Sequence, residues 1–474
     1  MSQAKTTQLV VIGGGPGGYA AAFLAADVGF EVTIVDTEPN PGGVCLYRGC
    51  IPSKALLHVA NVLSESKEAK NWGIEFSDPK IDLNKMRSWK DGIVTKMTSN
   101  LGQLCKLRKI TLIQGRASFR DSNTLAIQKD RGAEEELKFQ HAILASGSRP
   151  TSLPDLPSDP RILNSTGALE LRDVPKTLLV VGGGYIGLEL GTVYAALGTK
   201  VSIVEMTSGL LPGVDRDLTQ VLSKRLERIF HAIVLNTKVT KIKEGKNGIR
   251  VTFEGTQIKD NEQEFEKVLI AIGRKPNTSG LGLENTKIEL DERGFVKVNA
   301  QRQTKDQNIY AIGDVAGEPM LAHKASHEGR VAVEAISGHK VAFEPKAIPA
   351  VVFTDPEIAW CGLTETQATK ENRSIKIAKF PWGASGRATT LDRNDGLTKL
   401  ILDPETERII GVGIAGVGAG ELIAEGVLAV EMGALASDVK LSIHPHPTLS
   451  ETFMESAEVF FGQSTHLYRP KKAA

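Results

Sequence analysis

One local pattern occurs twice in this 474-residue chain, and it restricts the possible folds more than any other feature. In each copy a β-branched segment runs into a glycine-rich loop, an Ala-rich segment follows, and a second β-branched segment ends at an acidic residue. The loops occupy residues 13–18 and 182–187, and the acids are Asp36 and Glu205, each 18 positions after the last glycine of its loop. Strand, loop, helix and strand in this order are typical of a dinucleotide-binding unit. The repeated spacing therefore predicts two such units in one chain.

The glycines of these loops have distinct physical roles. The first makes a tight turn, the second lets the backbone approach a pyrophosphate at the helix N-terminus, and the third lets helix pack on strand. In order, they are Gly13, Gly15 and Gly18 in the first loop and Gly182, Gly184 and Gly187 in the second. A turn without a ligand is the alternative for a lone loop. We expect Asp36 to accept hydrogen bonds from a ribose, and Glu205 to favour NAD over NADP, because no basic residue follows it directly.

Composition and charge exclude several classes of protein. The net charge of +1 gives no reason to expect nucleic acid or a membrane surface as a partner, and no apolar run reaches the ~20 residues of a bilayer span. Only four cysteines occur, which predicts a reducing compartment, the cytoplasm, and not a disulfide framework. Because a strand is predicted from about residue 8, we expect no leader segment in this sequence.

A cysteine pair follows the first glycine loop, in G-V-C-L-Y-R-G-C-I-P-S-K. Cys45 and Cys50 would stand about 140° apart on a straight helix, so a bend at Gly49 is expected if they are to form a disulfide. A helix is predicted over 52–70 with Pro52 at its first position. Its N-terminus would stabilise a thiolate at Cys50, which we expect to be buried, with Cys45 as the exchanging thiol. Two unrelated buried cysteines are the alternative; a metal site is not expected, since no second Cys or His pair stands nearby at ligand spacing.

Disulfide exchange also needs a base, because the thiolate is the nucleophile. The candidate segment is H-P-H-P-T-L-S-E, in which Pro447 is expected to open a helix, with His446 at its edge and Glu451 one turn in, able to orient the imidazole. Spacing alone does not choose between His444 and His446, and a pair of surface histidines is the alternative.

Together these segments resemble the flavoprotein disulfide reductases over about residues 8–465, and most closely the branch that oxidises dihydrolipoamide with NAD⁺. The motifs that carry the resemblance are G-G-V-C-L-x-x-G-C-I-P-S-K, the two glycine loops, A-I-G-D-V, P-M-L-A-H-K and H-P-H-P-T-L-S-E. It implies an α/β fold with two Rossmann-like domains, for FAD and NAD, and an α+β C-terminal dimerisation domain. The implied boundaries are 1–150 and 276–348 for the two FAD segments, 151–275 for NAD and 349–474 for dimerisation.

The resemblance also assigns roles that spacing does not. Cys45 would be the interchange thiol and Cys50 the thiol that faces the flavin, while Lys54 would lie near the flavin and pair with Glu189. Of the two histidines, the resemblance selects His446 as the base, oriented by Glu451 and serving the cysteines of the other subunit in a homodimer. The first loop and Asp36 would hold FAD, with Asp314 on its ribityl-phosphate side. The remaining implied cofactor-binding positions are Gly115, Ser146, Gly147, Met320, Ala322 and Gly273.

Departures from the family pattern and rival functions are few. Tyr47-Arg48 stands where Asn-Val is common in the family. The charge of Arg48 would tune the redox potential of the disulfide or affect docking of a partner; alternatively, the Arg48 side chain would simply point to solvent. Glutathione-type reductases usually prefer NADP and would have basic residues directly after Glu205, which are absent here. Mercuric reductases typically have additional cysteines near the C-terminus, but no cysteine follows Cys361 in this chain. A flavin-bearing assembly subunit is the rival of a different class. The expected partners are a second copy of the chain and the lipoyl-bearing acyltransferase core of 2-oxo acid dehydrogenase complexes, or a lipoyl carrier protein.

Overall fold

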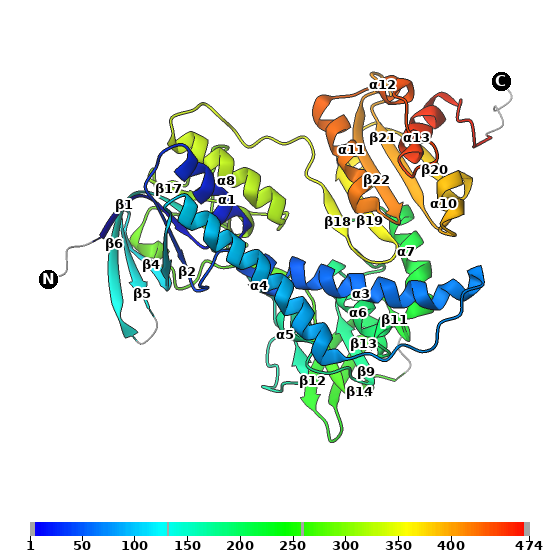
Figure 1. Ribbon diagram of the computed structural model, residues 1–474, viewed down its shortest axis with the longest axis horizontal. Helices are drawn as coiled ribbons and strands as arrows, with labels where there is room; N and C mark the ends of the chain where they lie inside the picture. Colours follow the sequence, from blue (N-terminus) through cyan, green and yellow to red (C-terminus); the bar gives the residue numbers. More distant parts are fainter. Residues whose placement is uncertain (1–4, 130–131, 257–259, 469–474) are drawn as a thin grey trace.

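The computed structural model describes residues 5–129, 132–256 and 260–468, and these form three lobes (Figure 1). The ends of the first and last expected domains, residues 1–4 and 469–474, lie outside the described residues. Each lobe is built around its own sheet, and the sheets differ in strand direction. The α/β fold class expected from the sequence is confirmed.

The first lobe contains a seven-stranded sheet of order β3-β2-β1-β6-β5-β4, in which β17 also pairs with β6. Its strands are β1 (Lys5–Ile12), β2 (Val32–Asp36), β3 (Thr111–Gln114), β4 (Arg116–Asp121), β5 (Thr124–Gln128), β6 (Glu134–Leu144) and β17 (Ile309–Ala311). The strands β3, β2, β1, β6 and β17 run parallel, while β4 and β5 form an antiparallel extension. Because β17 returns to this sheet late in the chain, the second lobe is inserted into the first.

The second lobe has a parallel sheet of order β11-β10-β9-β15-β8 and a three-stranded antiparallel sheet. Its strands are β8 (Ile162–Leu163), β9 (Thr177–Val181), β10 (Lys200–Val204), β11 (Ala232–Val234), β12 (Thr237–Glu244), β13 (Ile249–Gly255), β14 (Glu262–Phe265) and β15 (Lys267–Ile270). Two short strands, β7 (Ser148–Pro150) and β16 (Arg274–Pro276), pair where the chain enters and leaves this lobe. We therefore propose domain boundaries close to 150 and 275.

The third lobe is an antiparallel sheet of order β18-β19-β22-β21-β20, covered by α11 and α13. Its strands are β18 (Ala350–Val352), β19 (Glu357–Gly362), β20 (Lys376–Pro381), β21 (Leu397–Leu402) and β22 (Ile409–Gly416). Trp382 and Phe380 are fully buried in its core. This mixed α+β unit starts at 350, close to the expected boundary at 349.

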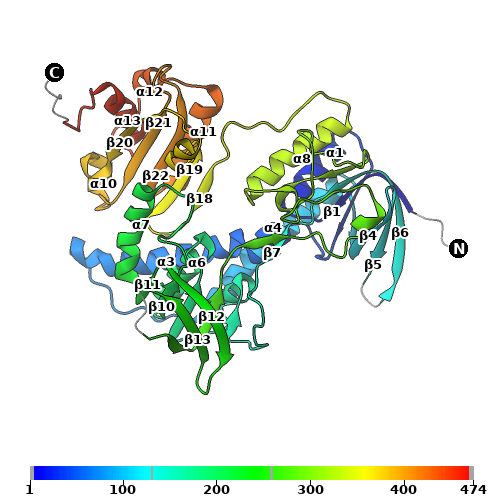
Figure 2. The same cartoon turned by 180° about the vertical axis from the view of Figure 1, so that it is seen from behind.

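Helices connect the lobes as well as covering their sheets. Their bounds are α1 (Pro16–Asp27), α2 (Gly43–Arg48), α3 (Cys50–Glu68), α4 (Leu83–Leu107), α5 (Ser165–Glu170), α6 (Tyr185–Ala196), α7 (Arg216–Ile229), α8 (Ala322–Ile336), α9 (Glu365–Lys370), α10 (Gly386–Thr390), α11 (Ala419–Met432), α12 (Ala436–Leu441) and α13 (Glu451–Phe461), with 3₁₀ turns η1 (Ala69–Trp72), η3 (Leu283–Asn285), η4 (Gly313–Ala316) and η5 (Trp382–Ala384). Helix α3 leaves the first lobe and runs between the other two, packed on α6, as Figures 1 and 2 both show. No helix within the described ranges is long and apolar enough to cross a membrane.

Several predicted element boundaries need correction. The helix predicted over 52–70 begins at Cys50, so Pro52 is its third residue, because Gly49 already ends α2 and starts the new helix. The helix expected from Pro447 begins only at Glu451, because Thr448 turns back and donates its N–H to Glu451 Oε2 at 2.9 Å. As a result, the candidate catalytic residues Cys50 and Glu451 are the first residues of α3 and α13.

Candidate active site

The two glycine loops fold almost identically, because glycine occupies the same sterically restricted positions in both. Gly13 and Gly182 directly follow their strands with φ of +103° and +108°, a conformation that L side chains rarely adopt. A Cβ on Gly18 would lie 1.9 Å from the Gly13 carbonyl oxygen, and one on Gly187 would lie 2.5 Å from that of Gly182. Only glycine allows the helix to start this close to the strand, so both loops meet the steric requirement of a dinucleotide site.

The acids after β2 and β10 hold these loops in the same way. Asp36 accepts the Gly14 N–H at 2.5 Å and the Glu38 N–H at 2.8 Å. In the second unit, Glu205 accepts the Gly183 N–H at 2.6 Å and the Thr207 N–H at 2.8 Å. Sequence reasoning expected these carboxylates to bind a ribose and missed their contacts to the loop. Each oxygen keeps a second lone pair, so one carboxylate can fix the loop and still accept a ribose hydroxyl.

A cavity of about 360 Å³ lies above the first loop, and most of the predicted FAD and redox residues line it. Those residues are Gly13, Gly15, Gly18, Asp36, Cys45, Cys50, Lys54, Ser146, Gly147, Glu189, Asp314, Met320 and Ala322. The backbone leaves room for a ligand: a Cβ on Gly15 would meet only the Gly43 Cα, at 3.9 Å, and one on Gly147 would meet nothing within 4 Å. Buried surroundings raise the pKa of Asp36, against the effect of the Gly14 N–H and the Arg48 guanidinium. The glycine loop at one end of this lining and the cysteine pair further along it leave room for a dinucleotide beside the thiols.

The predicted NAD residues lie outside this cavity, in the second lobe. Gly184 is the N-cap of α6, and a Cβ there would meet nothing within 4 Å, so the approach to the helix N-terminus is open. Gly273, at φ +111°, has equally open surroundings and its carbonyl accepts the Thr151 N–H at 2.9 Å. Gly115 was predicted to contact FAD; it does not line the cavity, but its N–H donates to the Asp36 carbonyl at 2.8 Å.

The cysteine pair sits where α2 ends and α3 begins. Cys45 is half-buried, and Cys50 is exposed toward the cavity, so the expectation of a buried Cys50 was wrong: the thiol faces the cavity and not the protein interior. A hydrogen bond from the Cys45 thiol, helped by the Lys54 ammonium and opposed by desolvation, lowers the pKa of Cys50 to about 7. The same hydrogen bond, with burial, raises the pKa of Cys45. When the pair loses one proton, the thiolate is therefore favoured on Cys50 over Cys45.

Lys54 and Glu189 meet, as the resemblance implied. The Lys54 ammonium lies 2.8 Å from Glu189 Oε2, which also accepts the Ser53 hydroxyl at 3.1 Å. Glu189 Oε1 accepts the N–H of Phe353, just after β18, at 3.0 Å. The Glu189 side chain is almost completely buried, so its charge depends on these donors for compensation. Sequence reasoning found the pair through the resemblance and missed Ser53 and Phe353.

Asp314 lies in the 3₁₀ turn after β17. Its Oδ2 accepts the Ser148 hydroxyl at 2.5 Å, and Arg274 donates to that hydroxyl at 2.7 Å. The turn is fixed from below by Glu328, which accepts the Gly313 N–H at 2.6 Å. The carboxylate thus faces the cavity from a rigid position.

The two candidate histidines have different surroundings. His444 uses both ring nitrogens within the protein, Nε2 with Glu425 at 2.7 Å and Nδ1 with the Ser442 carbonyl at 2.9 Å. His446 is 71% exposed, and its Nδ1 lies 2.9 Å from Glu451 Oε1. Although burial opposes it, the Thr448 N–H and the imidazole keep the pKa of Glu451 below its usual range. Of the two, His446 therefore presents an exposed ring that is oriented through Nδ1, and neither it nor Glu451 lines the cavity of its own chain.

Arg48, the departure between the cysteines, also lines the cavity. Its guanidinium pairs with Glu38 and stands 5.9 Å from the centre of the Tyr47 ring. The charge of Arg48 is thus directed to the Asp36 end of the cavity.

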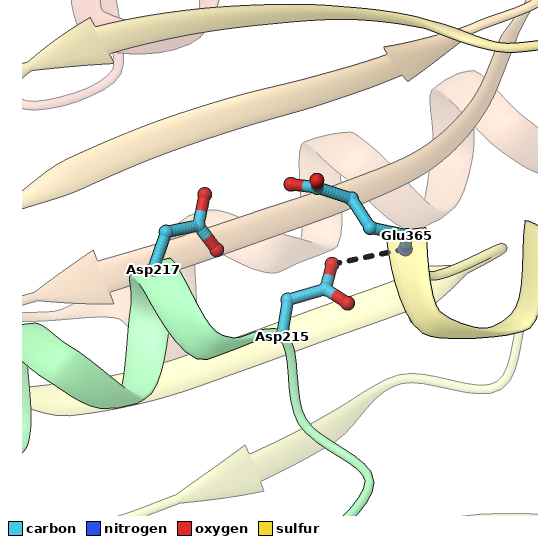
Figure 3. A group of neighbouring side chains, drawn as sticks. All are labelled: Asp215, Asp217 and Glu365. Carbon is cyan, nitrogen blue, oxygen red and sulfur yellow. Dashed lines mark hydrogen bonds between the residues drawn. The ribbon is translucent and has the colours of Figure 1, made fainter. Parts of the chain in front are cut away.

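A separate group of acids lies between the second and third lobes, where Asp215, Asp217 and Glu365 point toward one another (Figure 3). Asp215 Oδ2 also accepts the Glu365 N–H at 3.2 Å. The fully buried Lys399 ammonium reaches all three carboxylates, at 2.7, 2.8 and 2.8 Å. An ammonium thus occupies the position in which three acids of this kind would otherwise bind a cation.

Comparison with known proteins defines the class. Residues 7–329 match the pyridine nucleotide-disulphide oxidoreductase family, and residues 348–457 match the dimerisation domain of that family. The chain therefore belongs to the pyridine nucleotide-disulphide oxidoreductases, and the expected enzyme class and cofactors, FAD and NAD, are confirmed.

Among the relatives, dihydrolipoyl dehydrogenase from Haemophilus influenzae is 48% identical over 472 residues, covering 99% of this chain and 98% of its own. Dihydrolipoyl dehydrogenase from Bacillus subtilis is 44% identical over 466 residues and covers 98% of both chains. The crystal structure of LpdA from Mycobacterium tuberculosis superposes with a TM-score of 0.89 at 27% identity, covering 96% of this chain and 99% of that one.

Proposed function

We propose that this protein is a dihydrolipoyl dehydrogenase, which oxidises dihydrolipoamide to lipoamide and reduces NAD⁺. The observation that carries the proposal is the cysteine pair, which lines the same cavity as the first glycine loop and Asp314 and stabilises a thiolate on Cys50. The full-length identity to dihydrolipoyl dehydrogenases supports the choice of substrate.

The thiol steps follow from the chemistry of the pair. In the oxidised enzyme Cys45 and Cys50 form a disulfide, and His446 accepts a proton from the first thiol of dihydrolipoamide. The resulting thiolate attacks Cys45 Sγ, and Cys50 leaves as the thiolate that its surroundings favour. The second substrate thiol then attacks the mixed disulfide, which releases lipoamide and leaves Cys45 as a thiol. Two electrons and two protons thus pass from the substrate to the protein.

The residues of the cavity suit FAD. The first glycine loop would hold its pyrophosphate, Asp36 its ribose, and Asp314 the ribityl-phosphate side, while Lys54 would supply a positive charge beside the flavin. When bound, FAD supplies the chemistry that converts the two electrons of a dithiol into a hydride for NAD⁺. The second loop and Glu205 would hold NAD.

The proposal includes a homodimer in which each subunit supplies the base for the other. His446 and Glu451 do not line the cavity of their own chain, while the dimerisation domain that carries them exposes large apolar side chains close by. These are Leu428, Met432, Leu441 and Ile443, between 63% and 98% exposed. A patch of this kind is typical of an interface. We also propose a lipoyl-bearing acyltransferase core or lipoyl carrier protein as partner, and the cytoplasm as location, in line with a sequence that holds only four cysteines.

Turnover of the purified protein on free dihydrolipoamide with NAD⁺ tests the proposal, with NADP⁺ in parallel and glutathione disulfide with NADH or NADPH as controls. We expect rapid, NAD⁺-dependent oxidation of dihydrolipoamide and little activity in the controls. Absence of turnover by protein that holds FAD and a reducible disulfide would require another substrate.

A further inference from the structure

The Lys54–Glu189 pair joins three parts of the molecule. Lys54 comes from α3, Glu189 from α6 in the second lobe, and the N–H of Phe353 reaches Glu189 Oε1 from the third lobe at 3.0 Å. The ring of Phe353 also faces the lysine, with the Lys54 ammonium 4.4 Å from its centre. One residue of the third lobe therefore touches both members of the pair.

These contacts restrict where the ammonium can lie. It sits between a buried carboxylate oxygen, 2.8 Å away, and the face of an aromatic ring. An ammonium over a ring face is attracted by the ring quadrupole, most strongly where water is partly excluded. Phe353 is half-buried and packs against the apolar cluster that contains Leu56 and Leu57 on α3, so the ring has little freedom to move.

We propose that Phe353 is a positioning residue for Lys54, through which the dimerisation domain fixes an ammonium that lies beside the redox pair. Its N–H orients Glu189, and its ring holds the ammonium on the side of the cavity. The inference rests on the proposed function only in placing Lys54 beside the flavin and the cysteines. Neither glycine loop supplies this contact, and the cysteine motif does not supply it either.

The expected consequence is a change in the redox balance of the cysteines. The charged groups that face Cys50 are Lys54, which favours its thiolate, and Glu189, which opposes it, with the Cys45 thiol and the Tyr185 phenol close by. A disulfide whose reduced form is stabilised is a stronger oxidant. Loss of the ring should free the ammonium, weaken its effect on the thiolate and make the Cys45–Cys50 disulfide harder to reduce.

The test uses the holoenzyme in dithiothreitol redox buffers, with acid quenching and mass-spectrometric counting of reduced Cys45 and Cys50. We expect Phe353→Leu to lower the equilibrium constant for reduction about threefold, which is ~14 mV at 29.6 mV per tenfold change. Phe353→Trp keeps a ring face and should stay within about 1.5-fold of the parent protein. Phe353→Met provides a second non-aromatic variant, with a more adaptable side chain, should the leucine variant fail to retain FAD.

A matched control exists in the same domain. Phe460 carries a similar contact, with the Lys376 ammonium 3.9 Å from its ring centre, but it lies outside the cavity lining, so Phe460→Leu should leave the equilibrium unchanged. The proposal is overturned if neither non-aromatic variant shifts the equilibrium more than Phe460→Leu does, or if Phe353→Trp shifts it as much as they do. Dihydrolipoamide turnover by the parent protein tests the proposed function separately, since the redox titration needs no lipoyl substrate.

Discussion

At the scale of single residues, the two histidines of one short segment have opposite surroundings. His444 is fixed at both nitrogens, whereas His446 is held only through Nδ1 by Glu451. We therefore expect His446→Gln to slow dihydrolipoamide oxidation about 10²–10⁴-fold, the usual contribution of a general base, because the substrate thiol loses its proton acceptor. His444→Gln should change the rate little. Steady-state kinetics of both variants provide the measurement, and equal losses would contradict the assignment.

The thiol of Cys50 should titrate in the neutral range. Its pKa of about 7 is below the ordinary thiol value, so the thiolate prevails above this pH and is lost as the pH falls through it. In a Cys45→Ser background, where a hydroxyl replaces the donating thiol, the rate of Cys50 alkylation followed by peptide mass spectrometry should show this titration. Burial raises the pKa of Cys105 to about 11 and of Cys361 to about 12, so neither competes. Lys54→Met should move the titration upward, and an unchanged midpoint would contradict the role of the lysine charge.

At the scale of elements, regular patterns in the sequence predicted the structure well where a local rule applies. The two β-branched segments of the second copy form strands, as the repeated pattern predicted, at Thr177–Val181 and Lys200–Val204. Helix α4 begins at Leu83 because the Asp82 side chain caps it by accepting the Lys85 N–H. The first residues of α3 and α13 were less predictable, because the preference of proline for the first turn of a helix was the only local rule available. The start of α3 is set by the backbone at Gly49, and the start of α13 by the turn at Thr448.

Long-range partners lay beyond sequence reasoning altogether. No spacing rule joins Phe353 to Glu189, or Ser148 to Asp314, because these contacts depend on how separate sheets pack together. The resemblance supplied the Lys54–Glu189 pair, yet the donors that balance the buried Glu189 became visible only in three dimensions.

Helix α8 should fix the turn that carries Asp314. Glu328, fully buried on this helix, accepts the Gly313 N–H and binds Arg302 at 2.7 Å and Lys324 at 3.0 Å. Glu328→Gln keeps the shape of the side chain but removes the negative charge that pairs with the buried Lys324 and the half-buried Arg302. We therefore expect a loss of about 3–5 kcal/mol in the free energy of unfolding and faster release of FAD. Denaturant unfolding and the recovery of flavin fluorescence measure the two effects.

The same substitution at Glu334, further along α8, provides the control for this prediction. A Glu328 variant that retains both FAD and stability to the same extent as the Glu334 variant would show that the turn does not depend on the carboxylate.

At the scale of the whole molecule, ion pairs join the lobes as well as apolar contacts. Arg225 of α7 in the second lobe pairs with Glu68 at the end of α3 and with Asp355 in the third lobe, the latter at 3.2 Å. Lys399 on β21 pairs with Asp215 and Asp217 near the start of α7. The second and third lobes are therefore connected through charged side chains on α7 and at its N-cap, Asp215. The arrangement of the redox site depends on how these lobes are held together.

Lys399 should be the strongest single ionic contribution to this interface, because its ammonium is fully buried and reaches three carboxylates. In Lys399→Met, the partly exposed Lys379 would be the remaining cation that the structure describes beside Asp215, Asp217 and Glu365. We therefore expect the free energy of unfolding to fall by about 3–5 kcal/mol. Lys379→Met, which removes a cation in contact with two of the acids, should cost less. Urea unfolding at pH 7 provides the comparison.

The pH dependence distinguishes this ionic effect from a simple packing change. Although burial opposes it, the two lysines lower the pKa of Asp217 below its ordinary value near 4. The stability that Asp217 contributes is therefore complete above about pH 4 and is lost as the pH falls through its lowered pKa in the folded protein. In Lys399→Met the carboxylates should accept protons at higher pH, which relieves their repulsion. The difference in unfolding midpoint between this variant and the parent should thus shrink between pH 7 and acid pH, and a constant difference would mean that packing of the side chain, not its charge, holds the two lobes together.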